Sequence, residues 1–288
     1  IASRYVAQGY GEMPWSRKFL SSTLNWVFGR ILSINVRDLS SGFRLYHRNA
    51  IGKLDLHYET YAVLQEILAK AYCRGYRVIE EPFHYLPRRH GSSHARVFKF
   101  GIVYLKSLYT LWKLRNSLNS ADYEARAFNS RIPLQRWWQR KRCHIIRDFA
   151  EDKMRVLDVG CGSSQLLNSI PQMVGLDSNA DKLRYMRRPA RCLVNAAVES
   201  LPFPDSAFEV IIASELLEHM AAEVTPLDEI RRCLESGALL IISTPDYHRW
   251  QWRLVKLLYD LLQPDSRTDR HITTYTLASL KNLLQRYG

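Results

Sequence analysis

Two glycines and an aspartate stand where the sequence predicts a ligand-binding turn. Gly160 and Gly162 lie in RVLDVGCGSSQLL, residues 155–167, which is typical of a buried strand followed by a tight turn and a helix. Glycine allows the backbone to pass close to a ligand, and the N-terminus of the helix suits a carboxylate or a phosphate. Asp177 ends the next predicted strand, where it could accept hydrogen bonds from both hydroxyls of a ribose. These residues predict a bound nucleoside.

The spacing of the glycines argues against a nicotinamide dinucleotide. The dinucleotide fingerprint G-x-G-x-x-G needs a third glycine at position 165, where close helix packing makes room for a pyrophosphate. This chain has Gln165 there. Adenosine joined to a methionine carboxylate satisfies the requirements of both the turn and the acid.

The segments around these residues predict a parallel sheet. From Arg155 onward, apolar runs typical of strands alternate with amphipathic helical segments. The predicted strands are RVLDV, MVGLD, RCLVN, FEVIIA and ALLIIS. This alternation indicates an α/β fold with helices on both faces of the sheet. It places a ligand between RVLDV and FEVIIA, where the strand order reverses, and the helical, basic stretch 122–150 is expected to cap the sheet.

From about residue 120 to the end, the sequence resembles the class I S-adenosylmethionine-dependent methyltransferases. The matching blocks occur in the family's order and are VLDVGCG, VGLDSN, LPFPDSAFEVI, ASELLEHM and LLIISTP. The resemblance implies a Rossmann-like, doubly wound sheet with S-adenosylmethionine as the cofactor. The candidate cofactor-binding residues are Asp158, Gly160, Gly162, Asp177 and Ser214. Of these, the resemblance implies that the first three line the amino-acid part of the cofactor and that Asp177 binds its ribose.

The chain departs from this family at three places, one of which is Glu235-Ser236-Gly237 before the fifth strand, where many relatives have Pro-Gly-Gly. Ala197 stands where the family usually has an acid near the adenine, with Asn195 and Glu199 close by. The chain also ends at Gly288, where the family adds two more strands. We therefore expect a methyltransferase sheet whose last strands are missing, and an adenine site without the family's usual acid.

Two histidines are the candidate catalytic residues of this region. Methyl transfer is an in-line displacement at an activated sulfonium methyl group, so positioning supplies most of the rate, and a base is needed only when the acceptor carries a proton. His219, in SELLEHM, and His271, in DRHITTYT, lie where the family faces its substrate. A hydrogen-bonded or surface imidazole is the alternative for each, and Glu218 could equally cap a helix or pair with a cation. No metal site is predicted, and the five cysteines form no C-x-x-C pair.

The first 115 residues or so resemble the carboxyl-terminal half of family 2 glycosyltransferases of the polyprenyl-phosphate mannosyltransferase type. That family has D-x-x-S-G-F-R, a helical Q-E-I, G-Y-R with E-x-P, and R-x-x-G-x-S-K. Here these blocks are Asp38–Arg44, Gln65–Ile67, Gly75–Pro82 and Arg88–His94, the last with His94 in place of lysine. The resemblance implies a partial α/β glycosyltransferase domain that carries the acceptor side of the reaction.

This second resemblance assigns four residues to the acceptor. Asp38 is a candidate base or polar contact, and Arg44, Arg88 and Arg89 are candidates for binding a phosphate or diphosphate, which the planar guanidinium suits. The alternative for Arg88 and Arg89 is an ordinary solvated surface, with Glu66 pairing with one of them. The family's metal and nucleotide-sugar site would lie upstream of the first residue, so a divalent metal and a nucleotide sugar are expected only with that upstream domain.

An aromatic and basic segment follows. Residues 97–114 are largely apolar, but Lys99, Lys106 and Lys113 recur every seven residues and form one stripe along a helix. Three lysines are too many for a membrane-spanning helix, which favours a helix that lies at an anionic membrane surface. A helix packed against the domain with its lysines in water is the alternative.

The net charge of +13 is concentrated at the front of the chain. Residues 1–118 carry +11 of it, which is compatible with anionic lipid, nucleic acid or a phosphorylated substrate, or with solubility alone. Nucleic acid is not the expected partner, because the sequence contains no recognisable nucleic-acid-binding module. Widely spaced cysteines, odd in number, favour a reducing, cytoplasmic location, at the cytoplasmic face of a membrane if the helix binds lipid.

These observations lead to one hypothesis and three alternatives. We predict a partial glycosyltransferase domain at 1–96, an interfacial helix and linker at 97–118 and a methyltransferase domain at 119–288, with RNSLNSA as the connecting segment. The hypothesis is a fragment of a bifunctional glycosyltransferase and methyltransferase of lipid-linked or cell-surface glycan biosynthesis, whose methyl acceptor is a glycan, a polyprenyl phosphate or a small molecule. The alternatives are a stand-alone methyltransferase of a lipid or metabolite with a docking front region, a nucleic-acid methyltransferase, and a non-catalytic cofactor binder.

Overall fold

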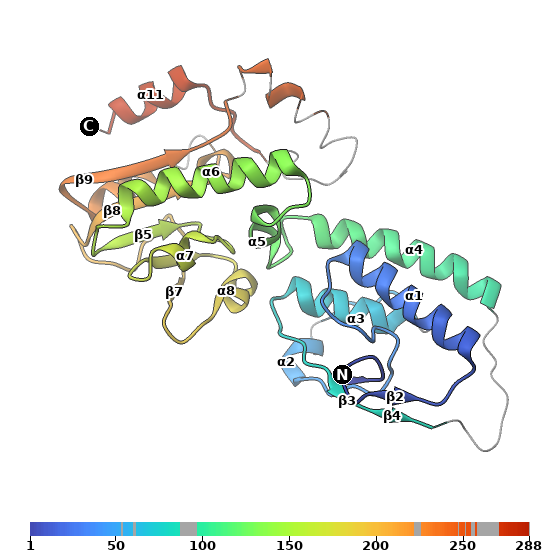
Figure 1. Ribbon diagram of the computed structural model, residues 1–288. Coiled ribbons are helices and arrows are strands. Elements are labelled where there is room, and N and C mark those ends of the chain that lie inside the picture. Colours follow the sequence, from blue (N-terminus) through green and yellow to red (C-terminus); the bar gives the residue numbers. More distant parts are fainter. Residues whose placement is uncertain are drawn as a thin grey trace. The chain divides into compact units, whose positions relative to one another are not determined.

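The computed structural model describes residues 1–52, 54–59, 62–86, 97–221, 226–246, 248–250, 252–254, 257 and 271–287, with side chains from residue 102 onward in the helix that begins at Val97. The chain folds as two compact units, Ile1–Ser120 and Ala121–Gly288, drawn in blue to green and in green to red in Figure 1. The boundary between the units falls within the predicted connecting segment RNSLNSA.

The connecting segment is polar in composition, but much of it is buried. Arg115 and Ser120 are fully buried. The Arg115 guanidinium donates to the carbonyl oxygens of Leu32 (2.9 Å) and Ser33 (3.2 Å) and to the hydroxyl of Ser120 (2.7 Å). The front unit itself supplies the hydrogen-bond partners of these polar side chains. A polar composition therefore does not by itself indicate exposure to solvent.

The front unit combines helices with very short strands. Its helices are α1 Trp15–Leu32, α2 Arg48–Ile51, α3 Ala62–Cys73 and α4 Val97–Asn116. Its described strands are β1 Ala2–Ser3, β2 Tyr10–Gly11, β3 Glu81–Pro82 and β4 His84–Tyr85. β1 pairs in parallel with β3, and β2 pairs in parallel with β4.

Helix α4, predicted to lie at a membrane surface, belongs to the front unit and packs into its core. Leu108 and Leu111 are buried with Phe28 and Leu32 of α1 and with Leu68 of α3. The opposite side of α4 is exposed to solvent and carries Ile102, Leu105 and Tyr109 together with Lys106, so it combines apolar and basic side chains. Among the described helices, none has the length and apolar character that a bilayer crossing requires.

The rear unit is a five-stranded parallel sheet with helices on both faces (Figure 1). Its strands are β5 Val156–Val159, β6 Val174–Asp177, β7 Cys192–Asn195, β8 Phe208–Ser214 and β9 Leu234–Ser243, in the order β7-β6-β5-β8-β9. Its described helices are α5 Tyr123–Phe128, α6 Pro133–Ala150, α7 Leu166–Ser169, α8 Ala180–Met186, the 3₁₀ helix η1 Leu217–His219, α9 Leu227–Cys233 and α11 Leu277–Gln285. This is the predicted Rossmann-like, doubly wound architecture, and the prediction is confirmed.

Alternating side chains along the central strands build two cores. Val156 and Val210 face one side, where residues of α6, α7 and α8 cover them. Leu157 and Ile211 face the other side, under α9 and α11. Since β5 and β8 are neighbours while the chain runs outward in both directions from them, the strand order reverses between them, as predicted. A ligand site is therefore expected at their carboxyl ends.

Candidate functional site

The turn after β5 requires both of its glycines. Gly160 has φ +70° and Gly162 has φ +54°, a left-handed conformation that strains any residue with a side chain. A Cβ at Gly160 would lie 2.8 Å from Cδ1 of Leu216, and a Cβ at Gly162 would lie 2.9 Å from Cδ of Glu124. The close approach of the backbone at this turn therefore has a geometric basis.

Asp177, at the end of β6, lies against the same turn. Its Oδ2 accepts a hydrogen bond from the backbone N–H of Gly162 (2.8 Å), and its Oδ1 accepts one from the N–H of Asn179 (2.7 Å). The structure thus brings together the acid predicted to bind a ribose and the glycine turn. Each carboxylate oxygen retains further acceptor capacity for a hydroxyl group.

Asp158 is the buried charge of the site. Its side chain is 3% exposed, and its Oδ2 has no hydrogen-bond partner among the described residues. Burial raises the pKa of this carboxyl to about 7; the guanidinium of Arg142 opposes the shift and the charge of Asp177 adds to it. A carboxylate that the protein does not neutralise suits a cationic group of a ligand.

Glu124 of α5 forms hydrogen bonds with the residue that follows the glycine turn. No spacing pattern in the sequence predicts this role. Its Oε2 accepts from the N–H (3.2 Å) and the hydroxyl (2.7 Å) of Ser163, and Lys182 of α8 pairs with its Oε1. In return, the Ser163 hydroxyl accepts from the N–H groups of Glu124 and Ala125 at the start of α5. Helices α5 and α8 are tied to the turn in this way.

Arg142 of α6 is a second residue that the sequence did not indicate. Its Nη1 lies 3.5 Å from Oε2 of Glu215, whose side chain is largely buried. Glu215 follows β8 directly and has φ +58°, an uncommon conformation for a residue with a side chain. Arg142 also lowers the pKa of Asp158, so one guanidinium acts on two carboxylates at the ends of neighbouring strands.

Ser214 lies at the end of β8, opposite Ser243 of β9. The two hydroxyl oxygens are 2.7 Å apart and share a hydrogen bond. The pairing places Ser214 at the predicted edge of the sheet, with its side chain turned to the neighbouring strand.

The two predicted catalytic histidines meet beyond β8. The rings of His219 and His271 lie edge to face with their centroids 4.9 Å apart. Burial lowers the pKa of His271, and the carboxylate of Glu215 opposes that shift. Glu218, which is fully buried, completes a group of three: one ligand-capable atom on each of Glu218, His219 and His271 lies within 4.8 Å of the others.

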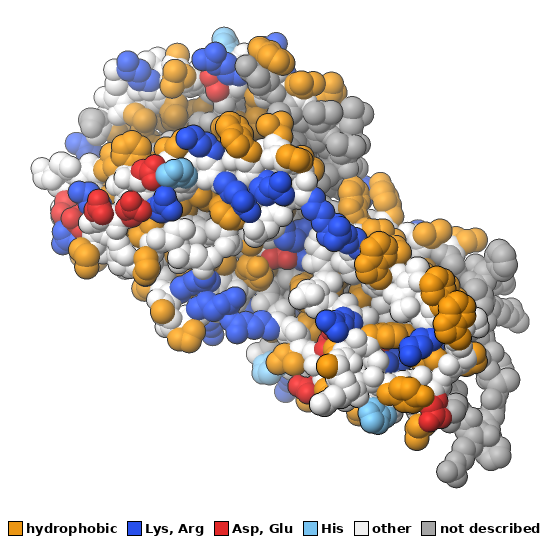
Figure 2. Space-filling model, in the orientation of Figure 1, with side chains coloured by type: hydrophobic (Ala, Val, Ile, Leu, Met, Phe, Trp, Pro, Cys, Tyr) orange, Lys and Arg blue, Asp and Glu red, His pale blue; other side chains and the backbone are white. Residues whose placement is uncertain are grey.

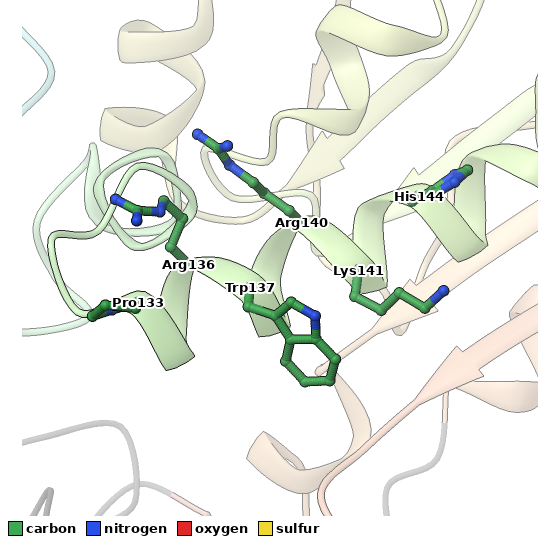
Figure 3. A pocket seen from close by; sticks show the side chains of 6 residues that line it. All are labelled: Pro133, Arg136, Trp137, Arg140, Lys141 and His144. Atoms are coloured by element: carbon green, nitrogen blue, oxygen red, sulfur yellow. The ribbon is translucent and has the colours of Figure 1, made fainter.

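A surface hollow runs along α6, away from these residues in the fold. It has a volume of about 410 Å³ and is lined by Pro133, Arg136, Trp137, Arg140, Lys141 and His144. All six side chains project from this one helix (Figure 3). A hollow bounded by a single helix face lacks the converging polar groups of a cofactor site, and we assign the cofactor to the strand ends instead.

In the front unit, Asp38 is held in an ion pair. Its side chain is fully buried, and Arg4 donates to both carboxylate oxygens from Nε and Nη2, each at 2.8 Å. Burial alone would raise the pKa of Asp38, but the hydrogen bonds from Arg4 and Ser40 outweigh it and lower the pKa. The predicted role of Asp38 as a base or polar contact of the acceptor stays a prediction.

Arg44, whose predicted phosphate contact stays a prediction, forms hydrogen bonds with backbone carbonyl oxygens. Its guanidinium donates to the carbonyl oxygens of Ser41 (2.7 Å), Leu64 (2.7 Å) and Leu39 (2.6 Å). These hydrogen bonds close a loop of the front unit. The other two candidates for phosphate, Arg88 and Arg89, lie outside the described residues.

Glu66, offered as a partner for those arginines, has a different cation. It pairs with Lys70 at 2.7 Å and accepts from the N–H groups of His57 and Tyr58. Burial raises the pKa of Glu66, but these partners outweigh it and lower the pKa. The Q-E-I block therefore holds the segment before α3 in place.

Residues 134–288, just over half of the chain, match the family model described as a methyltransferase domain. The chain belongs to this methyltransferase family. Together with the parallel sheet, this membership identifies the rear unit as a class I S-adenosylmethionine-dependent methyltransferase domain, and it implies S-adenosylmethionine as the cofactor.

Two curated relatives of the methyltransferase chain are similar over parts of it. A polyprenol monophosphomannose synthase of Mycolicibacterium smegmatis is 32% identical over 97 residues, which cover 32% of this chain and 37% of that protein. A ubiquinone/menaquinone biosynthesis C-methyltransferase of Shewanella sp. (strain ANA-3) is 27% identical over 143 residues, 44% of this chain and 55% of the relative. The chain spans from about a third to about half of the length of these relatives.

Solved structures are similar to the methyltransferase chain at low identity. The YcgJ protein of Bacillus subtilis is 18% identical with a TM-score of 0.42, over 51% of this chain and 68% of that one. A putative methyltransferase of Bacillus halodurans C-125 is 17% identical with a TM-score of 0.40, again over 51% of this chain and 68% of that one.

The residues at the ends of β5 and β6 fit the implied cofactor. The buried Oδ2 of Asp158 suits the ammonium group of a methionine moiety, because a buried carboxylate gains from a charge-assisted hydrogen bond. Gly160 and Gly162 give the turn a left-handed backbone that packs closely against Leu216 and Glu124, which fixes its position at the end of β5. Asp177 ends β6, the position at which an acid in this architecture binds a ribose.

Proposed function

We propose that this chain transfers a methyl group from S-adenosylmethionine to an acceptor of lipid-linked or cell-surface glycan biosynthesis. The observation that carries the methyltransferase part is the pair of carboxylates, Asp158 and Asp177, beside a turn with two left-handed glycines. The position of Asp158 suits an ammonium group, and the position of Asp177 suits a pair of ribose hydroxyls. S-adenosylmethionine carries both of these groups.

The cofactor supplies a methyl group already activated on a sulfonium. The chain's own residues hold the reactants: Asp158 binds the ammonium group, the turn at Gly160 and Gly162 admits the amino-acid part, and Asp177 binds the ribose. Positioning of this kind supplies most of the acceleration of a displacement reaction. His219 and His271, beyond β8, are on the side that we assign to the acceptor.

The glycan pathway is supported by the front unit. Three blocks resembling polyprenyl-phosphate mannosyltransferases lie in the described residues, and a polyprenol monophosphomannose synthase is 32% identical over 97 residues. Two of these blocks shape loops, because Arg44 closes one through carbonyl oxygens and Glu66 fixes another through N–H groups. We assign the front unit to the acceptor side of a glycosyltransferase, with Arg88 and Arg89 as its candidates for phosphate.

A methylation screen tests this function. The whole chain is incubated with cofactor labelled on its methyl group and with polyprenyl-phosphate sugars, surface glycans, free sugars and nucleic acid in parallel. We expect label in a glycan or lipid-linked sugar, and none with an Asp177→Ala variant. Label confined to nucleic acid, or to acceptors without a sugar or polyprenyl group, would overturn the assignment to glycan biosynthesis.

An exposed apolar surface on α1 and α4 supports attachment to an anionic membrane. The two helices are neighbours, with the rings of Phe28 and Tyr104 5.4 Å apart. Trp15 is 79% exposed and stacks on Phe19, and Ile102 is 74% exposed. Figure 2 shows hydrophobic side chains gathered over the part of the front unit that holds these helices, with lysine and arginine side chains between them. Aromatic and aliphatic groups flanked by cations suit the boundary of an anionic bilayer.

Vesicle co-sedimentation tests this attachment. Replacing Lys106 and Lys113 with alanine should lower partition onto vesicles of phosphatidylglycerol and phosphatidylcholine by about 30-fold, because each cation contributes about 1 kcal/mol near an anionic surface. Leu105→Ser should lower partition onto neutral vesicles as well. The matched control is Leu134→Ser, an exposed leucine of the rear unit. Equal partition of all these variants would exclude the α1 and α4 surface.

A further inference from the structure

Three side chains from distant parts of the sequence converge at the carboxyl end of β8. Glu218 and His219 belong to η1, and His271 precedes α11. One ligand-capable atom of each lies within 4.8 Å of the others, and Glu218 is fully buried. Two imidazole nitrogens and one carboxylate oxygen at this separation form a donor set of the kind that binds divalent transition metals.

The backbone fixes this convergence. The N–H groups of Ile272 (2.8 Å) and Thr273 (3.2 Å) both donate to the carbonyl oxygen of Glu218. The hydroxyl of Thr273 donates to the carbonyl oxygen of Met220 (2.6 Å), across 53 positions of sequence. These bonds hold the segment after His271 against η1, so the backbone positions that carry the three side chains are fixed relative to one another.

Two further features indicate function at this place. Glu215, three residues before Glu218, is held in the left-handed region at φ +58°, and backbone strain of this kind is concentrated at ligand sites. The carboxylate of Glu218 is buried and lies beside the two imidazoles.

We propose that Glu218, His219 and His271 bind one divalent transition-metal ion, such as Zn²⁺, Mn²⁺ or Fe²⁺, with coordination positions left for a substrate oxygen. Mg²⁺ and Ca²⁺ are disfavoured because they prefer oxygen ligands. The sequence predicted no metal site because its expected signal was paired cysteines, whereas these ligands come from a short 3₁₀ helix and a segment far along the chain.

The position of this site relative to the glycine turn gives the proposal a consequence for the substrate, which rests on the proposed function. Leu216, two residues before Glu218, is the residue whose Cδ1 would lie 2.8 Å from a Cβ at Gly160. The ion is therefore next to the turn that admits the methyl donor. A hydroxyl group bound to such an ion has a lowered pKa.

The acceptor atom is accordingly an oxygen. The hydroxyl releases its proton to water on binding the ion, and its lone pair forms the new O–C bond. The C–S bond breaks, and its electron pair stays on the sulfur of the departing thioether. In this arrangement His219 and His271 act through the ion and not as free bases.

Metal titration of the whole chain tests the site without any cofactor. After removal of bound metal with a chelator, Co²⁺ is added and its visible absorption is followed, and Zn²⁺ binding is measured by calorimetry. We expect one ion per chain, with displacement of Co²⁺ by Zn²⁺. His271→Ala and Glu218→Gln should each weaken binding on the order of 100-fold. The matched control is His248→Ala, which removes an exposed histidine outside the group.

The outcomes separate this proposal from the proposed function. If wild-type chain binds no ion, or binds it equally well after His271→Ala and after Glu218→Gln, the metal site is wrong. The Co²⁺ spectrum of the unmodified chain decides the matter even if a variant fails to fold, because nitrogen and oxygen ligands in a low-coordinate site give intense absorption and surface binding does not. Cofactor affinity, measured separately by calorimetry, tests the methyltransferase function whatever the metal does.

Discussion

Asp38 in the front unit and Asp158 in the rear unit are both buried, at 0% and 3% exposure, but their surroundings differ. Arg4 donates to both oxygens of Asp38, and the pKa of that carboxyl is lowered. Asp158 has an oxygen without a partner among the described residues, and burial raises the pKa of its carboxyl to about 7. The first charge is neutralised by an ion pair within the protein, whereas we propose that the second meets a cationic group of a ligand.

The arginines of the two units repeat this contrast. Arg44 donates to three carbonyl oxygens and so completes a loop of the front unit. Arg142 lies 3.5 Å from the carboxylate of Glu215 and also acts on Asp158, at the edge of the sheet that we propose as the cofactor site. Residues that a motif selects can therefore serve the loop that carries them or the ligand beside it, and only their contacts distinguish the two roles.

The largest effect that would test this contrast is expected for Asp38→Asn. The substitution leaves Arg4 without its anionic partner in a buried site, which costs about 3–5 kcal/mol. Because the pKa of Asp38 is lowered by folding, its contribution is present at neutral pH and is lost as the pH falls through the lowered pKa. Hydrogen exchange of the amides in α1 and α3, followed by mass spectrometry, measures the loss in the front unit alone.

The control for this measurement is Asp55→Asn, which removes an acid whose side chain is 89% exposed. It should leave the exchange rates of α1 and α3 unchanged, because a surface ion pair contributes little. Wild-type protection in the Asp38→Asn variant would mean that the pair with Arg4 is not structural, and the contrast between the units would be lost.

The opposite sign is expected for Asp158→Asn in the absence of cofactor. Folding raises the pKa of this carboxyl from 3.8 to about 7, so ionisation favours the unfolded chain and wild-type stability falls as the pH rises from about 4 to about 7. The variant avoids this penalty and should be more stable above pH 7, by at most about 4 kcal/mol at about 1.4 kcal/mol for each pKa unit. Thermal unfolding at pH 4 and pH 8 measures the difference, which should appear at pH 8 only.

Much of the rear unit could be predicted because its signals are local. The run VLDV is β5 and the run VGLD is β6, since buried parallel strands are continuous apolar segments ended by turns. Gly160 and Gly162 are at the predicted turn because a left-handed backbone needs glycine. The prediction for the last strand differs more from the structure. The predicted run ALLIIS starts at Ala238, whereas β9 begins at Leu234.

What could not be predicted depends on contacts between distant segments. The burial of Arg115 requires the carbonyl oxygens of Leu32 and Ser33, which no local pattern reveals. The contact between the rings of His219 and His271 depends on backbone hydrogen bonds from the segment after His271 to Glu218, which is distant in the sequence. Motif resemblance located Arg44 correctly in the sequence but could not say that carbonyl oxygens would occupy its donors.

Asp177→Ala sharpens the comparison from the side of the ligand. The substitution removes the acceptor for two ribose hydroxyls, and cofactor affinity should fall by about 100-fold, because hydrogen bonds to a charged group contribute about 1.5–3 kcal/mol each. Asp181→Ala is the matched control, since it removes another acid of the same segment, one that pairs with Arg184. Calorimetry with S-adenosylmethionine measures both, and equal affinities would remove Asp177 from the cofactor site.

The smallest effect, and the most specific to Asp158, is a dependence of cofactor affinity on pH. In the free protein this carboxyl has a pKa of about 7, so at pH 6 it is mainly protonated and must lose its proton to bind an ammonium group. As the pH is raised toward 7, cofactor affinity should therefore increase by up to about tenfold for each pH unit. Above pH 7 the affinity should level off. Asp158→Asn should bind more weakly at pH 8 and show no such dependence.

Calorimetry in two buffers with different ionisation enthalpies reads this proton directly. At pH 6 the wild-type chain should release about one proton for each cofactor bound, and the Asp158→Asn variant should release none. Asp38→Asn is the appropriate control here, because Asp38 is already ionised by Arg4 and exchanges no proton in this range. Equal proton release from wild type and the Asp158→Asn variant would show that the unpaired oxygen of Asp158 does not face the ammonium group, and Asp158 would then have to be regarded, like Asp38, as part of the frame of its own unit.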